Sequence, residues 1–208
     1  MTRRFLPILV TGSLLWLTAP SAQGAPPRLV LERPEADLPS TRPGHPPPPD
    51  DPLDTCGIVP AAAPEFTLED VNPSSPTFGL EIPRTDPGNA TLIYIALASC
   101  GVCQADTDAL GVLVAEQGDA WADLSVRVLA LNTAHDSLPD LADGHDLPIV
   151  VDTDELDLEA QYGAERWYIY LLDRAGQPAR IHYDLNFTTE RDRLIGEVGA
   201  LLAGEDLP

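Results

Sequence analysis

The chain has 208 residues, with 33 Asp and Glu against 12 Arg and no Lys, so its formal net charge at pH 7 is −21. An acidic surface of this kind argues against binding to nucleic acids or to anionic lipids. The length is that of one domain with extensions.

A secretory signal is predicted over residues 1–24. Arg3 and Arg4 precede an apolar segment, Phe5–Leu17, and Ala22-Gln23-Gly24 offers small residues for cleavage. The alternative is a retained membrane anchor, although the apolar segment is short for a membrane span. The pattern therefore predicts a secreted or periplasmic protein that has no stable membrane insertion once the signal is cleaved.

Residues 25–60 are predicted to form a disordered linker. Proline and acidic residues dominate it, as in Pro46-Pro47-Pro48-Pro49-Asp50-Asp51. Such a segment has too few apolar side chains to offset the entropy lost on ordering. Cys56 lies where this linker meets the domain predicted over residues 61–208. Its role stays open between a tether for the linker, an intermolecular disulfide and a free thiol.

Within the domain, strands are predicted to alternate with helices. This order, closed by a hairpin and a last helix, predicts an α/β sandwich around one mixed sheet. The predicted strands are 65–70, 78–82, 92–98, 124–131, 147–152, 167–172 and 179–183; the predicted helices begin after Cys100 and span 155–162 and 188–203; residues 133–146 are predicted to be a polar loop.

Two cysteines, Cys100 and Cys103, stand where a buried strand gives way to a helix that ends near Gly118. The unpaired backbone N–H groups and the positive dipole end at a helix start favour a thiolate over a thiol. Cys100 is first in the turn and nearer to solvent, so we expect it to be the nucleophile. Cys103, one turn into the helix, is then expected to resolve a mixed disulfide.

This interpretation competes with two others. The pair is also compatible with a structural disulfide in a non-catalytic scaffold, or with half of a metal site, in which Cys56 or a histidine would join Cys100 and Cys103. A dithiol enzyme of this kind needs no cofactor. Its expected partners are protein or small-molecule disulfides and dithiols.

Three segments resemble the thioredoxin fold, and specifically its redoxin branch, the alkyl hydroperoxide reductase and thiol-specific antioxidant superfamily. They are Ala63–Leu68, the Cys100-Gly101-Val102-Cys103 motif and Leu171–Gly176. A looser resemblance links Ala96–Cys103 to the N-terminal domain of selenoprotein P, with Cys100 in place of selenocysteine. The resemblance implies a three-layer sandwich with a central mixed sheet and an extracytoplasmic thiol–disulfide oxidoreductase.

One feature departs from that pattern. The family usually has a cis-proline just before a late strand, facing the cysteines, whereas residues 164–168 contain no proline and Trp167 or Tyr168 occupies that place. In the family this proline docks the substrate and shields the thiols from metal, so its absence favours the metal-binding alternative somewhat and raises a question about how substrates dock.

Other polar residues are given structural interpretations. His135, His145 and His182 lie on or beside predicted loops without ligand spacing to the cysteines, so we expect them at the surface. Asp106 and Asp108, early in the predicted helix, are interpreted as helix-terminal charges rather than acid–base groups.

Overall fold

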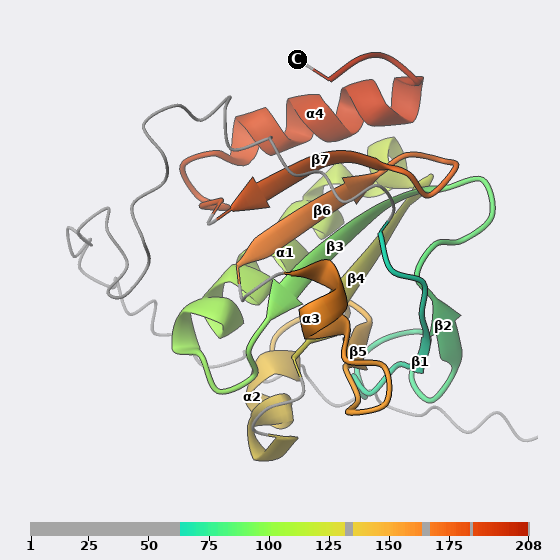
Figure 1. Cartoon of the computed structure of the whole chain (residues 1–208). Helices are drawn as coiled ribbons and strands as arrows, with labels where there is room; N and C mark the ends of the chain where they lie inside the picture. Colours follow the sequence, from blue (N-terminus) through green and yellow to red (C-terminus); the bar gives the residue numbers. More distant parts are fainter. Residues whose placement is uncertain (1–62, 132–134, 164–166, 184, 208) are drawn as a thin grey trace, which may run out of the picture. The chain divides into compact units, whose positions relative to one another are not determined.

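A mixed five-stranded sheet forms the centre of the computed structural model, which describes residues 63–131, 135–163, 167–183 and 185–207. The strand order is β5-β4-β3-β6-β7 (Figure 1). The pairs β3–β4 and β4–β5 are parallel, whereas β3–β6 and β6–β7 are antiparallel. The strands are β3 (Ala90–Ala96), β4 (Leu124–Ala130), β5 (Ile149–Val151), β6 (Tyr168–Leu172) and β7 (Pro178–Tyr183).

The remaining elements surround this sheet. A two-stranded antiparallel sheet joins β1 (Thr67–Glu69) to β2 (Glu81–Pro83). The α-helices are α1 (Gly101–Gln117), α2 (Leu138–Ala142), α3 (Leu158–Tyr162) and α4 (Arg191–Ala203). The described residues also form two short 3₁₀ helices, η2 (Gly118–Trp121) and η3 (His135–Ser137). No helix among the described residues is long and apolar enough to cross a membrane.

Alternate residues of β3 point into two separate cores, which makes the unit three-layered. Leu92 and Tyr94 belong to the core shared with α1 and α4, whereas Ile93 and Ile95 belong to the core shared with α3 and β1–β2. Figure 1 shows α1 behind the sheet and α3 in front of it. The predicted three-layer sandwich around a mixed sheet is therefore confirmed.

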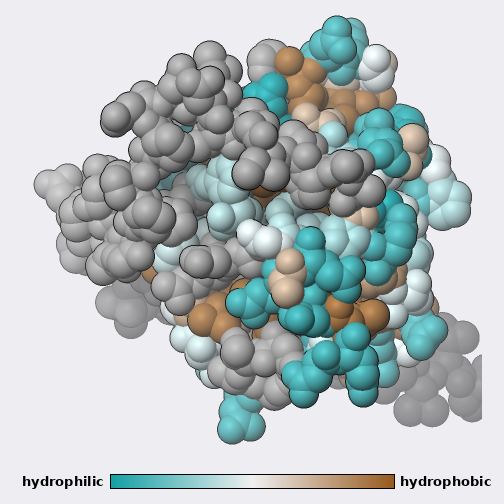
Figure 2. Space-filling model, viewed as in Figure 1, coloured by the Kyte–Doolittle hydropathy of each residue, from teal (hydrophilic) through white to brown (hydrophobic). Residues whose placement is uncertain are grey.

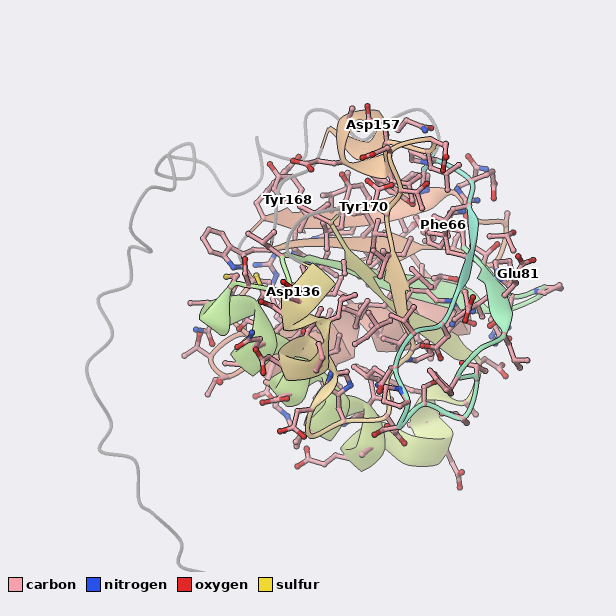
Figure 3. All side chains as sticks on the ribbon, turned by 90° about the horizontal axis from the view of Figure 1, so that it is seen from below. Phe66, Glu81, Asp136, Asp157, Tyr168 and Tyr170 are labelled. Atoms are coloured by element: carbon pink, nitrogen blue, oxygen red, sulfur yellow. The ribbon has the colours of Figure 1, made fainter. Side chains whose placement is uncertain are left out.

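The second core contains three buried aromatic residues, Phe66, Tyr162 and Tyr170. Tyr162 of α3 and Tyr170 of β6 pack edge to face with ring centroids 4.8 Å apart, and the Tyr170 hydroxyl donates to the Tyr162 carbonyl at 3.1 Å. Phe66 belongs to the same core and is labelled with Tyr170 in Figure 3. Among the residues coloured in Figure 2, hydrophilic ones predominate on the face seen, and hydrophobic ones form smaller separate patches.

Several predicted boundaries differ from those of the structure. The segment 133–146, expected as a loop, contains η3 and α2. The second strand begins at Glu81 because residues 77–79 form a turn, which leaves Phe78 exposed. The third helix begins at Leu158, whose N–H donates to the buried carboxylate of Asp152 at 2.9 Å. The last helix begins at Arg191.

The histidines also differ from expectation. His145 and His182 are buried, with 9% and 4% of their surface exposed, so the prediction of surface histidines is wrong for both. His182 lies in β7, and its Nε2 donates to the buried carboxylate of Glu197 in α4 at 2.5 Å. His145 lies between α2 and β5, and both of its ring nitrogens bond the backbone. The side chain of His135 lies outside the described residues.

Gly111 of α1 gives a test of how this helix packs. A Cβ there would lie 2.6 Å from the Cβ of His145, whose ring is held by the Leu141 carbonyl at 2.8 Å and the Leu147 N–H at 3.2 Å. Alanine normally stabilises a helix relative to glycine. Here overpacking prevails, so we expect Gly111→Ala to lower the free energy of unfolding by about 1–3 kcal/mol.

The matched control is Gly199→Ala in α4, where an added Cβ meets no atom within 4 Å. We expect this variant to raise the free energy of unfolding by about 0.5–1 kcal/mol. Urea denaturation of both variants measures the difference. Equal stabilisation by the two substitutions would contradict the close packing of α1 against the His145 loop.

Candidate active site

Cys100 and Cys103 lie at the junction of β3 and α1, at the carboxyl end of the central strand. After β3 ends at Ala96, the N–H of Cys100 donates to the Leu97 carbonyl at 2.9 Å, and this turn places Cys100 at the N-cap of α1. The side chain of Gln104 donates to the Ala98 carbonyl at 2.8 Å, which fixes the turn from the helix side. The sulfur atoms, yellow in Figure 3, lie beside the beginning of α1.

The two thiols lie in different surroundings. Cys100 is partly exposed, whereas none of the Cys103 surface is exposed. The backbone N–H of Cys103 donates to the Sγ of Cys100 at 3.3 Å, so the sulfur serves as the capping acceptor of the helix. An N–H donor and a helix N-terminus both stabilise negative charge on sulfur, which is what an attacking cysteine requires.

Burial gives Cys103 the opposite character. Burial, together with the hydrogen bond to Cys100, raises the pKa of Cys103 to about 12. The negative charge of Asp106 contributes in the same direction. At neutral pH Cys103 is therefore a protonated thiol, inaccessible to a protein substrate. The structure thus places the two predicted site residues together but makes them unequal.

A third feature is the pair formed by Tyr94 and Asp106. Tyr94 of β3 is 1% exposed, and its hydroxyl donates to Oδ2 of Asp106 at 3.2 Å. The interpretation of Asp106 and Asp108 as helix-terminal charges is wrong, because α1 begins at Gly101 and has no acidic residue in its first turn. Sequence reasoning did not find this contact, because the two residues are twelve positions apart in different elements.

Trp167 occupies the place where the predicted family pattern has a proline. It directly precedes β6 and belongs to the same buried core as Cys103. Its backbone N–H donates to the Ile95 carbonyl at 2.8 Å. Its φ of 74° lies in the left-handed region, which is unusual for a large side chain. The described residues contain no cis peptide bond. The backbone before β6 therefore differs in kind from a cis-proline turn.

Metal ligands do not gather around the cysteines in the described part of the chain. Over those residues no three His, Cys, Asp or Glu side chains come close enough to hold an ion together. Cys56 and the side chain of His135 lie outside the described residues. The structure therefore offers no observation that favours the metal-binding alternative over dithiol chemistry.

No family model matches the chain, and no curated protein matches it. Solved structures do. A candidate protein disulfide isomerase from Bacteroides thetaiotaomicron has a TM-score of 0.56 and 19% identity, over 68% of this chain and 88% of that one. A candidate thioredoxin from Neisseria meningitidis has a TM-score of 0.52 and 17% identity, over 65% and 88%.

A secreted disulfide oxidoreductase from Mycobacterium tuberculosis, described as homologous to Escherichia coli DsbE, has a TM-score of 0.50 and 15% identity, over 65% of this chain and 96% of that one. At such identities the likeness concerns the fold. They agree with the thioredoxin-like fold that the sequence resembles. The chain has a thioredoxin-like fold, with Cys100 and Cys103 at the start of the helix that follows its central strand.

Proposed function

We propose that the chain is a thiol–disulfide oxidoreductase in which Cys100 attacks and Cys103 resolves. The observation that carries the proposal is the inequality of the two thiols. Cys100 is partly exposed and caps α1, whereas Cys103 is wholly buried and protonated at neutral pH. A permanent structural disulfide would not require one sulfur to be accessible and the other buried. A thiol–disulfide exchange reaction does require an accessible sulfur that attacks the substrate and a second sulfur that reacts only after the mixed disulfide has formed.

In the reducing direction, the Cys100 thiolate attacks one sulfur of a substrate disulfide and displaces the other as a thiolate, which takes up a proton. The Cys103 sulfur then loses its proton and attacks Sγ of Cys100, which releases the second substrate thiolate and leaves a Cys100–Cys103 disulfide. Two electrons have passed from the dithiol to the substrate. The reverse sequence oxidises a substrate dithiol, so both disulfides and dithiols are proposed partners.

We propose an extracytoplasmic location for this chemistry. The support is the signal pattern of residues 1–24, which lie outside the described residues, together with an oxidising compartment as the usual setting of a disulfide oxidoreductase. N-terminal sequencing of the exported protein tests this. We expect the mature chain to begin at Ala25, and an unprocessed chain retained in the cytoplasm would contradict the proposal.

The activity itself is tested with the reduced mature chain and insulin as a disulfide substrate, with dithiothreitol as electron donor. We expect catalytic reduction well above the rate with dithiothreitol alone. Elemental analysis of protein purified without chelator belongs to the same experiment. Absence of turnover together with a stoichiometric metal that is lost in Cys100→Ser would replace the proposal by the metal-binding alternative.

A further inference from the structure

The site turn, residues 97–100, connects β3 to α1 and influences both cysteines. The Leu97 carbonyl accepts the N–H of Cys100 at 2.9 Å, and the Cys100 carbonyl accepts the N–H of Gln104 at 3.0 Å. Burial raises the pKa of Cys103 to about 12, and a hydrogen bond from the Leu97 backbone acts in the opposite direction. The conformation of this turn therefore sets the surroundings of Cys100 directly and those of Cys103 through Leu97.

The middle of the site turn is buried. None of the Ala98 surface is exposed, whereas Leu97 is partly exposed and Ser99 is exposed. A backbone carbonyl away from water needs a hydrogen-bond donor from the protein, because a buried acceptor left unpaired destabilises the conformation that buries it. The side-chain amide of Gln104 is such a donor, with its Nε2 2.8 Å from the Ala98 oxygen.

Gln104 reaches the site turn from a fixed point. Its backbone lies near the beginning of α1, next to Cys103, and its N–H makes the first helical hydrogen bond, to the Cys100 carbonyl. Gln104 thus holds the turn at two points, with its backbone at Cys100 and its side chain at Ala98. An amide provides the second of these donors without placing a charge beside the sulfurs.

The capping position of Cys100 depends on the site turn. Cys100 has an extended backbone, with φ −92° and ψ 108°, and its Sγ accepts the N–H of Cys103 at 3.3 Å. A sulfur that turns away from the helix loses that donor and the positive end of the helix dipole, which both favour the attacking thiolate. The rate of attack therefore follows the fraction of chains whose site turn has the capping conformation.

We propose that Gln104 is a positioning residue for the attack by Cys100, because its side-chain amide keeps the site turn in the conformation in which Sγ of Cys100 caps α1. This inference rests on the proposed oxidoreductase function. Gln104 takes no part in the bond changes, which remain those of the two cysteines and the substrate. Its effect is on the fraction of folded chains that are ready to react.

The test replaces Gln104 by methionine, which has a similar length but no hydrogen-bond donor. The matched control is Gln117→Met, since Gln117 is also partly exposed and lies at the far end of the same helix. Every chain carries Cys56→Ser, so that only Cys100 and Cys103 react. Stopped-flow mixing of each reduced chain with excess 5,5′-dithiobis(2-nitrobenzoic acid) gives a first release of aromatic thiolate. Its rate depends on reagent concentration and reports attack by Cys100.

We expect Gln104→Met to slow this first phase about five- to tenfold at pH 7, which is the size of effect of one hydrogen bond. Gln104→Asn, whose amide is one methylene shorter, should slow it in the same direction and carries the test alone if Gln104→Met does not fold. Gln117→Met should stay within about twofold of the parent chain.

Hydrogen exchange of single backbone amides distinguishes a loosened turn from a general loss of stability. The N–H of Cys100, which is bonded to Leu97, should exchange faster in Gln104→Met than in the parent chain. The N–H of Leu110, in the middle of α1, should exchange at an unchanged rate.

First phases in Gln104→Met and Gln104→Asn as fast as in Gln117→Met would overturn the positioning role and leave the oxidoreductase function intact. A slower first phase with unchanged exchange at Cys100 would also overturn it, because the site turn would then not be the cause. Absence of any first phase in the parent chain would instead overturn the oxidoreductase function, and this inference with it.

Discussion

Cys103→Ser is expected to accumulate the chain as a mixed disulfide with its substrate, whereas Cys100→Ser is expected to form none and to lose turnover entirely. The reason is the placement of the two sulfurs. Cys100 is partly exposed at the N-cap of α1 and is free to attack, while Cys103 is wholly buried and is the only described thiol within reach of the resulting bond. Removing Cys103 therefore stops the reaction after its first step.

Both variants are best prepared in a Cys56→Ser background, because Cys56 lies outside the described residues and could otherwise resolve the adduct. Incubation of each reduced variant with glutathione disulfide, followed by mass spectrometry without reductant, counts the adducts. We expect one glutathione per Cys103→Ser chain and none on Cys100→Ser. The reverse pattern, or insulin reduction retained in Cys100→Ser, would contradict the assigned roles.

Glu197→Gln is expected to lower the free energy of unfolding at pH 7 by about 3 kcal/mol. Glu197 is 1% exposed and accepts hydrogen bonds from His182 at 2.5 Å, from Arg180 at 3.2 Å and from Arg193 at 3.2 Å. Neutralising it leaves two guanidinium groups without their shared counter-charge between β7 and α4. Chemical denaturation measures the loss.

The control is Glu190→Gln, which removes a partly exposed carboxylate at the N-cap of α4 that also bonds Arg193, at 3.0 Å. Exposed ion pairs contribute little, so we expect a change below about 1 kcal/mol. Equal losses in the two variants would mean that burial of Glu197 between β7 and α4 has no energetic consequence.

Glu197 also makes the free energy of unfolding depend on pH. Burial alone would raise the pKa of Glu197, but the hydrogen bond from His182 and the charges around it prevail and hold that pKa below its usual 4.5. Because the folded-state pKa is the lower one, its contribution to stability is complete above about pH 4.5 and is lost as pH falls through the folded value. The gap between the wild type and Glu197→Gln should therefore narrow in acid.

The sequence alone predicted the elements whose pattern is local. The uncharged run that includes Leu92–Ala96 is buried on both faces as β3, Gly118 caps α1, and the hairpin turn at 173–177 joins β6 to β7. The cysteine motif likewise predicted that Cys100 and Cys103 lie where β3 gives way to α1. In each case neighbouring residues carry the whole signal.

The contacts that the sequence did not predict are between residues that are distant along the chain and meet only in the folded structure. His182 and Glu197 are fifteen positions apart, and only the packing of α4 on β7 makes the histidine a buried partner rather than a surface residue. Tyr94 and Asp106 are twelve apart and meet only because α1 folds back along β3. Local sequence patterns do not indicate which distant residues will come into contact.

The reduction potential of the Cys100–Cys103 pair tests the central claim most directly. The mature protein is equilibrated in glutathione buffers of graded ratio, and the free thiols are counted at each. We expect a reversible two-electron transition between about −270 and −120 mV, the span of known dithiol oxidoreductases. A disulfide that resists reduction until well below about −300 mV would be a structural one, and would contradict the enzyme account.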